Sequence, residues 1–188
     1  MGHKNSKKSK KESQGHMEQK QGKEEVEPQS KSMPPPPTPD IGNIQFAMGC
    51  YWTGEGSLGA LPGVISTKAG SCVGHFETVR VYYDKKKTDP QTLQKQSGFK
   101  LVKANPTFIS ARSSQQKYYL QNTKGLSGLL KNIHSGGIVA GSETIAAQMN
   151  SLVGGYGSHE LLTSVVKEAN LNKKDASYLK RYFEARRK

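Results

Sequence analysis

Residues 1–40 contain no repeating pattern of apolar side chains, and this feature restricts the possible fold more than any other. The segment consists mainly of Lys, Glu, Gln and Ser and ends in the run MPPPPTPD. Such a composition buries too little apolar surface to offset the entropy lost on folding, and consecutive prolines favour an extended conformation. We therefore predict a disordered basic and proline-rich tail over residues 1–40, so that any core must form from residues 41–188.

From residue 41 onward the sequence shows short strand and helix patterns in alternation. The clearest is HFETVRVYYD, residues 75–84, whose apolar side chains recur at every second position. Asp89-Pro90 is typical of a helix N-cap followed by the first helical residue. Strands are expected at residues 44–48, 64–67, 75–84 and around 99–102, and helices at 53–61, 90–96 and from 113. This mixture predicts a small α+β sandwich core over residues 41–122.

The last third of the chain, residues 123–188, has helical patterns only. Ser142 and Ser158 are suitable N-caps, and Gly154-Gly155 separates the two helices that they begin. The segment SYLKRYFEARRK places apolar and aromatic residues on one helical face and basic residues elsewhere. We predict a C-terminal helical extension of two or three helices.

Composition limits the classes of function that need to be considered. The 188 residues carry a formal charge of +13, and 33% of them are hydrophobic. No window is apolar enough to span a membrane, and the two cysteines form neither a disulfide scaffold nor a zinc motif. We expect a cytoplasmic monomer without a metal or a resident cofactor. The charge favours an acidic partner, but no nucleic-acid-binding motif is present, so no specific nucleic-acid partner is expected.

The N-terminal residues MGHKNSKKSKK fit the pattern for N-myristoylation, with Gly2 as the acceptor and Ser6 at the required spacing. A single myristoyl chain binds membranes weakly, but the lysines that follow supply a second, electrostatic attachment. Gly2 is therefore a candidate lipidation site, and residues 2–11 a candidate contact with an anionic membrane surface. The alternative is an ordinary solvated basic tail.

Cys50 lies where the first strand ends and a helix is expected to begin, within the stretch MGCYWTGEG. The N-terminal end of a helix favours a thiolate, so the sequence predicts a Cys50 pKa below the usual range. Tyr51 and Trp52 are candidates for an aromatic pocket around an apolar group. Glycines at 49, 54 and 56 are expected to let a ligand approach the backbone closely. The alternative is a buried structural cysteine.

A second candidate lies on the strand at residues 75–84. His75 and Glu77 fall on the same face as Val79 and Val81, because side chains alternate along a strand. A carboxyl group on an apolar face is expected to have a raised pKa and to hold a proton near neutrality. The alternatives are a carboxylate paired with Lys or Arg, or a solvated face.

Four stretches in this order resemble motifs of the A-type peptide methionine sulfoxide reductases, which act on the S epimer. They are FAMGCYWTGE, GALPGVISTKAG, GHFETVRVYYD and SSQQKYYLQ. The first and third are the most specific, since Gly-Cys-aromatic-Trp followed by Gly-His-x-Glu-x-Val-x-Val is a rare combination. The resemblance covers residues 43–121, and it implies an α/β sandwich with a ferredoxin-like core.

The resemblance also implies an activity: reduction of methionine-S-sulfoxide, free or in peptides, through a cysteine sulfenic acid. In this interpretation Cys50 is the nucleophile and Glu77 donates a proton to the sulfoxide oxygen. Tyr51 and Trp52 hold the substrate methyl group, and Glu55 and His75 are expected to contribute to substrate binding. A thiol reductant such as thioredoxin then restores Cys50, with Cys72 as a candidate resolving cysteine.

The sequence departs from the family pattern where the family binds the sulfoxide oxygen. The family's Asn-Pro-Thr-Tyr loop before Gly-His-x-Glu is replaced by a few residues, and ANPTF at 104–108 stands elsewhere and has Phe108 instead of tyrosine. The family's later Gly-Asn-Asp-x-Gly-Thr-Gln-Tyr motif is absent. These departures keep a second interpretation open: a catalytically weak or inactive relative that acts as a membrane-associated, redox-sensing or binding module.

Overall fold

The protein is an α+β protein, as the sequence predicts, and its sheet is antiparallel. The structure is a computed structural model that describes residues 40–129 and 142–188. The sheet has five strands in the order β4-β1-β3-β2-β5. Their bounds are β1 Ile41–Ala47, β2 Val64–Cys72, β3 His75–Asp84, β4 Lys100–Leu101 and β5 Phe108–Ser110. The predicted tail, including Gly2 and residues 2–11, lies outside the described residues, apart from Asp40.

Helices are interspersed among the strands up to β5, and all the later elements of the described chain are helical. They are α1 Tyr51–Gly59, α2 Pro90–Ser97, the 3-10 turn η1 Ser113–Gln115, α3 Tyr118–Gln121, α5 Ser142–Val153, α6 His159–Glu168 and α7 Lys173–Arg186. The side chain of Asp89 accepts hydrogen bonds from the N–H groups of Gln91 and Thr92, and Ser158 caps α6 in the same manner. The N-caps predicted at Asp89 and Ser158 are therefore confirmed, whereas Ser142, also predicted as an N-cap, is the first residue of α5 itself.

The first hydrophobic core lies between one face of the sheet and helices α1 and α2. The strand at 75–84 alternates as predicted: Val79, Val81 and Tyr83 are buried on the face that packs against these helices. The other members of this core are Phe46 from β1, Val64 from β2, Leu58 from α1 and Leu93 from α2. Since Glu77 is two residues before Val79, alternation turns its side chain to the α1 face as well.

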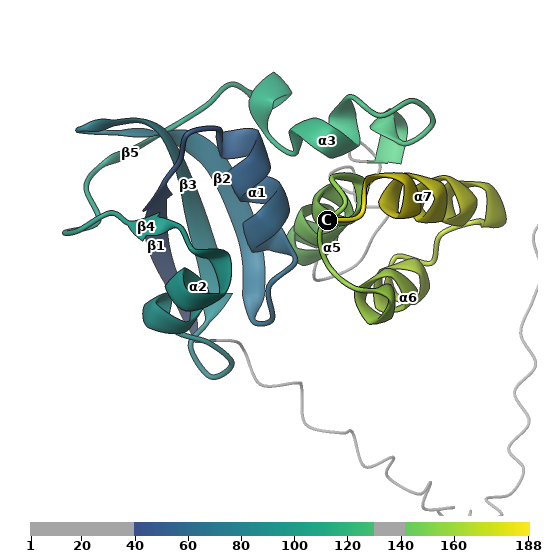
Figure 1. Ribbon diagram of the computed structural model, residues 1–188, viewed down its shortest axis with the longest axis horizontal. Coiled ribbons are helices and arrows are strands. Elements are labelled where there is room, and N and C mark those ends of the chain that lie inside the picture. The colour runs from purple at the N-terminus through teal and green to yellow at the C-terminus, as the bar shows by residue number, and fades with distance from the viewer. Residues whose placement is uncertain (1–39, 130–141) are drawn as a thin grey trace, which may run out of the picture. The chain divides into compact units, whose positions relative to one another are not determined.

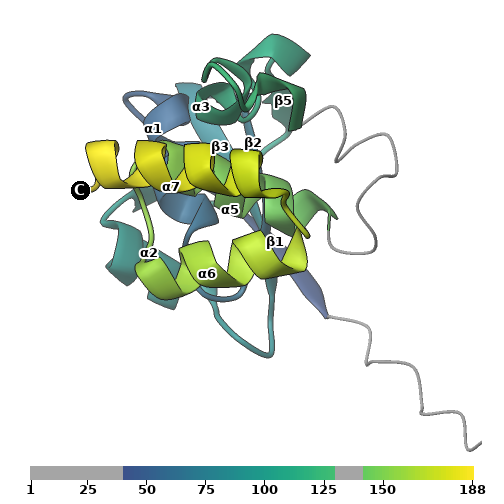
Figure 2. The ribbon, with the colours of Figure 1, turned by 90° about the vertical axis from the view of Figure 1, so that its right-hand side faces the viewer.

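The second hydrophobic core is formed by the later helices. Its largest fully buried members include Met149 and Leu152 from α5, and Leu179 and Phe183 from α7. Helix α5 also packs on α1 and β2, so that α1 lies between the sheet and α5 (Figure 1). Helices α6 and α7 lie side by side in front of α5 in the view of Figure 2. The predicted helical extension therefore belongs to the same compact unit as the sheet.

A close approach of backbones joins α1 to α5. A Cβ atom added to Gly59 would lie 2.6 Å from the hydroxyl oxygen of Ser151 and 2.8 Å from the carbonyl oxygen of Ala147. Real Cβ atoms are not found at such distances from backbone atoms, so α5 would have to move away. Glycine at this position thus sets the distance between α1 and the helical layer.

We expect Gly59→Ala to lower the free energy of unfolding by about 1–3 kcal/mol, the usual cost of overpacking. A decrease in the free energy of unfolding would be informative, because helix propensity alone favours alanine over glycine by roughly 1 kcal/mol and would change the stability in the opposite direction. Urea unfolding followed by far-ultraviolet circular dichroism measures the change. Gly49→Ala is the matched control, since a Cβ atom there meets nothing within 4 Å. Equal stability of the two variants would contradict this packing.

The connection from β4 to β5 was not anticipated from the sequence. These two strands lie at opposite edges of the sheet, so residues 102–107 must cross from one edge to the other. They cross on the face opposite to α1: the buried side chain of Gln45 donates to Asn105 Oδ1 at 2.7 Å and to the carbonyl oxygen of Pro106 at 2.6 Å. Ala104 and Asn105 both have positive φ, which is unusual for residues with a side chain.

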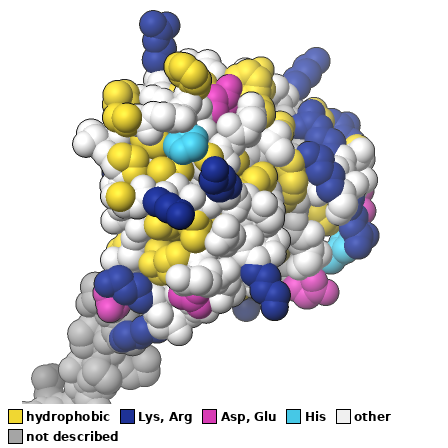
Figure 3. Space-filling view, turned by 60° about the vertical axis from the view of Figure 1, so that its left-hand side comes forward, with side chains coloured by type: hydrophobic (Ala, Val, Ile, Leu, Met, Phe, Trp, Pro, Cys, Tyr) yellow, Lys and Arg dark blue, Asp and Glu magenta, His cyan; other side chains and the backbone are white. Residues whose placement is uncertain are grey.

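The sequence suggested a contact with a membrane surface or with an acidic partner, so two properties of the described residues are relevant: the apolar character of the helices and the hydrophobic side chains at the surface. No helix in residues 40–129 or 142–188 combines the length and the apolar character needed to cross a membrane. The large hydrophobic side chains most exposed to solvent are Val73 in the β2–β3 turn, Phe76 near the start of β3 and Ile109 on β5. Figure 3 shows the left-hand side of the molecule in Figure 1, where hydrophobic side chains are scattered among lysines and arginines.

Candidate active site

Cys50 occupies a corner between β1 and α1, as the sequence predicts. It is the N-cap residue of α1, with extended backbone angles, and its side chain makes no capping hydrogen bond. The thiol is free and the residue is half-buried. Because Cys50 is the N-cap residue, it lies at the N-terminal end of α1, where the first backbone N–H groups have no partner within the helix. This placement leaves part of the Cys50 side chain accessible to a small ligand.

Glu77 is brought to the same corner by two hydrogen bonds. Its carboxylate oxygen Oε2 accepts a hydrogen bond from the backbone N–H of Tyr51 at 2.6 Å, and its carbonyl oxygen accepts one from the N–H of Met48 at 2.9 Å. The carboxyl group therefore lies at the first turn of α1, next to Cys50. Its second oxygen, Oε1, has no partner among the described residues and remains available to a ligand.

Tyr51 is half-buried at this corner and packs against the first core. Burial raises the pKa of its hydroxyl above 10, and the negative charges of Glu77, Cys50 and Glu55 raise it further. The phenol consequently stays protonated near neutral pH, so it can donate a hydrogen bond. The predicted group of Cys50, Tyr51 and Glu77 thus lies together at one site.

Trp52 stacks on Tyr118, a residue to which sequence reasoning assigned no role. The ring centroids are 3.7 Å apart and the planes differ by 10°, which is a stacked arrangement. The Tyr51 and Trp52 rings are 6.0 Å apart and inclined by 42°. The sequence signal for Tyr118 was its position in SSQQKYYLQ, a stretch interpreted as the start of a helix and as one of the four that resemble the family's motifs.

Glu55 lies beneath the site and has no solvent-exposed surface. Its carboxylate accepts hydrogen bonds from Lys117 Nζ at 2.8 Å, from the Lys117 backbone N–H at 2.7 Å, and from the Thr67 hydroxyl at 3.1 Å. Lys117 is also buried, and its ammonium group donates to the carbonyl oxygen of Thr67. With its carboxylate enclosed in this way, Glu55 supports the site rather than contacting a ligand.

Gln116 and Lys117 together attach the segment before α3 to the sheet and to α1. The Gln116 side chain accepts from the N–H of Ala69 at 2.9 Å and donates to its carbonyl oxygen at 2.8 Å, in the manner of a neighbouring strand. Lys117 then forms the buried ion pair with Glu55. Because Tyr118 follows directly, these contacts fix the ring that stacks on Trp52.

Cys72 is not brought to Cys50. It is buried near the end of β2, and its sulfur lies 3.5 Å from the Thr78 hydroxyl. Thr78 alternates with Glu77 along β3, so its side chain is on the sheet face away from α1. A disulfide between the two cysteines would require one sulfur to pass to the other face. His75 is half-buried and is paired in register with Cys72. A register shift between Gly70 and Cys72 interrupts the alternation at this end of the sheet, so the predicted placement of His75 on the Glu77 face is not supported.

Two of the glycines near Cys50 have a different role from the predicted one. A Cβ atom on Gly54 would lie 2.5 Å from the sulfur of Met48, and one on Gly56 would lie within 3 Å of the Tyr156 and Tyr119 rings. Both positions are buried. They make room for these protein side chains, whereas Gly49 is exposed and open to solvent.

Comparison with known proteins gives no information on the function of this protein, so a function can be inferred only from the geometry of the site. No protein-family model matches the sequence, and no curated protein matches it significantly. Within residues 40–129 and 142–188, no group of three or more His, Cys, Asp or Glu side chains is placed to bind a metal ion.

Proposed function

We propose that this protein reduces methionine sulfoxide to methionine, with Cys50 as the nucleophile and Glu77 as the proton donor. The observation that carries the proposal is the hydrogen bond from the Tyr51 N–H to Glu77 Oε2, 2.6 Å long. It holds a carboxyl group beside a cysteine at a helix N-terminus, with an aromatic pair next to both. A thiol, an acid and an aromatic surface are the groups that reduction of a methyl sulfoxide requires.

The reaction balances in four steps. The Cys50 thiolate attacks the sulfoxide sulfur while the Glu77 carboxyl group transfers its proton to the sulfoxide oxygen. The hydroxyl oxygen then passes to the Cys50 sulfur as the substrate S–O bond and the new bond between the two sulfurs break, so methionine leaves and Cys50 becomes a sulfenic acid. One thiol displaces water from the sulfenic acid, and a second thiol releases Cys50 from the resulting mixed disulfide. Substrate sulfur gains the two electrons that these thiols lose.

The proposal assigns the reduction of Cys50 to an external thiol, of which a thioredoxin-like protein is one class. Cys72 is the other cysteine of the chain, and its sulfur is hydrogen-bonded on the opposite face of the sheet. Cys50, by contrast, is half-buried at a corner that a second protein can reach. A resolving role for Cys72 is therefore not part of the proposal.

The proposal includes a ferredoxin-like core for residues 41–101. The chain order β1-α1-β2-β3-α2-β4 and the spatial order β4-β1-β3-β2 support it, because both are those of the split βαβ arrangement. Helices α1 and α2 pack on the same face of this sheet. In such an arrangement the end of β1, the start of α1 and the start of β3 meet at one edge, which is where Cys50 and Glu77 lie.

Turnover of a methionine-S-sulfoxide peptide with dithiothreitol tests the proposal, with the methionine product separated and quantified by chromatography. We expect turnover by the wild-type protein and background rates for Cys50→Ser. Cys72→Ser is the matched control and is expected to retain turnover, since an external thiol recycles Cys50. Turnover that survives in Cys50→Ser, or none in the folded wild-type protein, would refute the proposal and leave the binding-module interpretation.

A further inference from the structure

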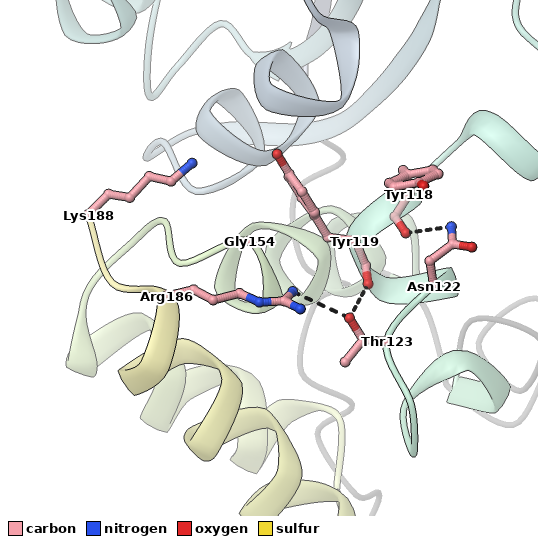
Figure 4. A pocket seen from close by; sticks show the side chains of 7 residues that line it. All are labelled: Tyr118, Tyr119, Asn122, Thr123, Gly154, Arg186 and Lys188. Atoms are coloured by element: carbon pink, nitrogen blue, oxygen red, sulfur yellow. Dashed lines mark hydrogen bonds between the residues drawn. The ribbon is translucent and has the colours of Figure 1, made fainter.

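A pocket of about 530 Å³ lies beside the aromatic stack of Trp52 and Tyr118 (Figure 4). It is formed by α3, by the end of α5, and by the chain at and after the end of α7. Its lining residues are Tyr118, Tyr119, Asn122, Thr123, Gly154, Arg186 and Lys188. The volume is within the range of sites that hold small molecules or single side chains.

The charged side chains that line this pocket are all basic. Arg186 and Lys188 both line it, and no acidic residue does. The Arg186 guanidinium donates to the carbonyl oxygen of Val153 at 3.0 Å, and the Lys188 ammonium lies 4.0 Å from the centroid of the Tyr156 ring. All of these partners are neutral. Within the described part of the chain, no carboxylate forms an ion pair with either cation.

Tyr118 connects the pocket to the Cys50 corner. This residue lines the pocket and also stacks on Trp52, which is two residues from Cys50. In Figure 4, Arg186 reaches toward Thr123 on one side of the pocket, and Tyr118 and Asn122 lie on the other. A peptide whose methionine sulfoxide lies at Cys50 can therefore extend past the stack into the pocket.

We infer that this pocket is a specificity subsite for the carboxylate of an Asp or Glu in the substrate peptide, a few residues from the methionine sulfoxide. The guanidinium fork and the ammonium group bind the carboxylate, and the tyrosine rings contact its methylene groups. The inference rests on the proposed function for the identity of the substrate. It adds that acidic methionine-containing segments are preferred over neutral ones.

Binding to the full-length Cys50→Ser variant tests the subsite without requiring turnover. The probes are fluorescent methionine sulfoxide peptides with one Glu placed about two to five residues to either side of the sulfoxide. Matched peptides have Gln in place of Glu. In fluorescence anisotropy titrations we expect at least one Glu peptide to bind about tenfold more tightly than its Gln partner, as one lost charge-assisted contact implies.

Arg186→Gln and Lys188→Gln, each added to Cys50→Ser, are expected to remove this preference and leave the affinity for Gln peptides unchanged. Lys167→Gln and Lys180→Gln, each added separately to Cys50→Ser, are the charge-matched controls, because both lysines are exposed on helices α6 and α7 and neither lines the pocket. Arg186 also bonds to Val153, so Lys188→Gln serves as the variant with the smaller structural role, and circular dichroism verifies that each variant folds.

The possible outcomes separate the subsite from the activity. Equal binding of Glu and Gln peptides, or an equal loss of preference in the Lys167→Gln and Lys180→Gln controls, would refute the subsite whatever the turnover result. A Glu preference that depends on Arg186 and Lys188 supports the subsite even if wild-type turnover is absent. Where turnover occurs, the pocket variants should raise the KM for the Glu peptide about tenfold and leave kcat unchanged.

Discussion

Replacing Lys117 with methionine is expected to lower the free energy of unfolding by about 3–5 kcal/mol, one of the largest losses that a single change in this chain can cause. Glu55 has no exposed surface, and Lys117 supplies its counter-charge at 2.8 Å. Methionine fills a similar volume but leaves the carboxylate buried without a positive partner. Urea unfolding, followed both by circular dichroism and by the fluorescence of the one tryptophan, measures the loss.

A double-mutant cycle separates the ion pair from simple packing. In Glu55→Gln combined with Lys117→Met, the glutamine amide can still accept from the residue 117 N–H and can donate to Thr67 in place of the ammonium group. We expect this double variant to regain much of the stability lost in Lys117→Met. A Lys117→Met protein as stable as the wild type would contradict a coupled buried pair. So would a double variant whose loss in the free energy of unfolding equals the sum of the losses in the two single variants.

The same pair connects stability to the candidate site. Lys117 precedes Tyr118, and Glu55 lies one turn along α1 from Trp52. The ion pair and the Trp52–Tyr118 stack thus bind the same two segments together. We attribute the burial of a charged pair at this place to the positioning of the aromatic wall, since a well-packed apolar pair would serve stability equally well.

The parts of the fold that sequence reasoning predicted well depend on local patterns. Strand β3 was expected over residues 75–84 and is observed there, because strict alternation specifies both a strand and its buried face. Asp89 and Ser158 were recognised as caps because a cap is formed within a few residues of sequence. The meeting of Cys50 and Glu77 came from the family resemblance, which carries long-range information that periodicity lacks.

The parts that were missed depend on contacts between distant residues. The pairing of Glu55 with Lys117 spans 62 residues, and nothing in the local sequence of either residue indicates a partner. Strand β5 is only three residues long and is defined by its pairing with β2. The pocket of Arg186 and Lys188 forms because α5 and α7 pack against each other, so the positive residues at 186–188 gave no sign of a lining role.

Glu77→Gln is expected to lower kcat for methionine sulfoxide reduction by about 10²–10⁴-fold, the usual contribution of a positioned general acid. Glutamine preserves the structure at this corner, since its amide oxygen can accept the Tyr51 N–H in place of Glu77 Oε2. It cannot deliver a proton to the sulfoxide oxygen, so the loss should appear in kcat rather than in the affinity for substrate. Single-turnover production of methionine by wild-type and variant proteins measures it.

Alkylation of Cys50 by iodoacetamide distinguishes this role from an effect on the nucleophile. Removing the negative charge of Glu77 from beside Cys50 does not disfavour a thiolate, so Glu77→Gln should be alkylated at least as fast as the wild type. Slow turnover with undiminished alkylation therefore identifies Glu77 as the acid. If alkylation slows in parallel with turnover, the carboxylate acts on the thiol instead, and the assignment of proton donation to Glu77 is wrong.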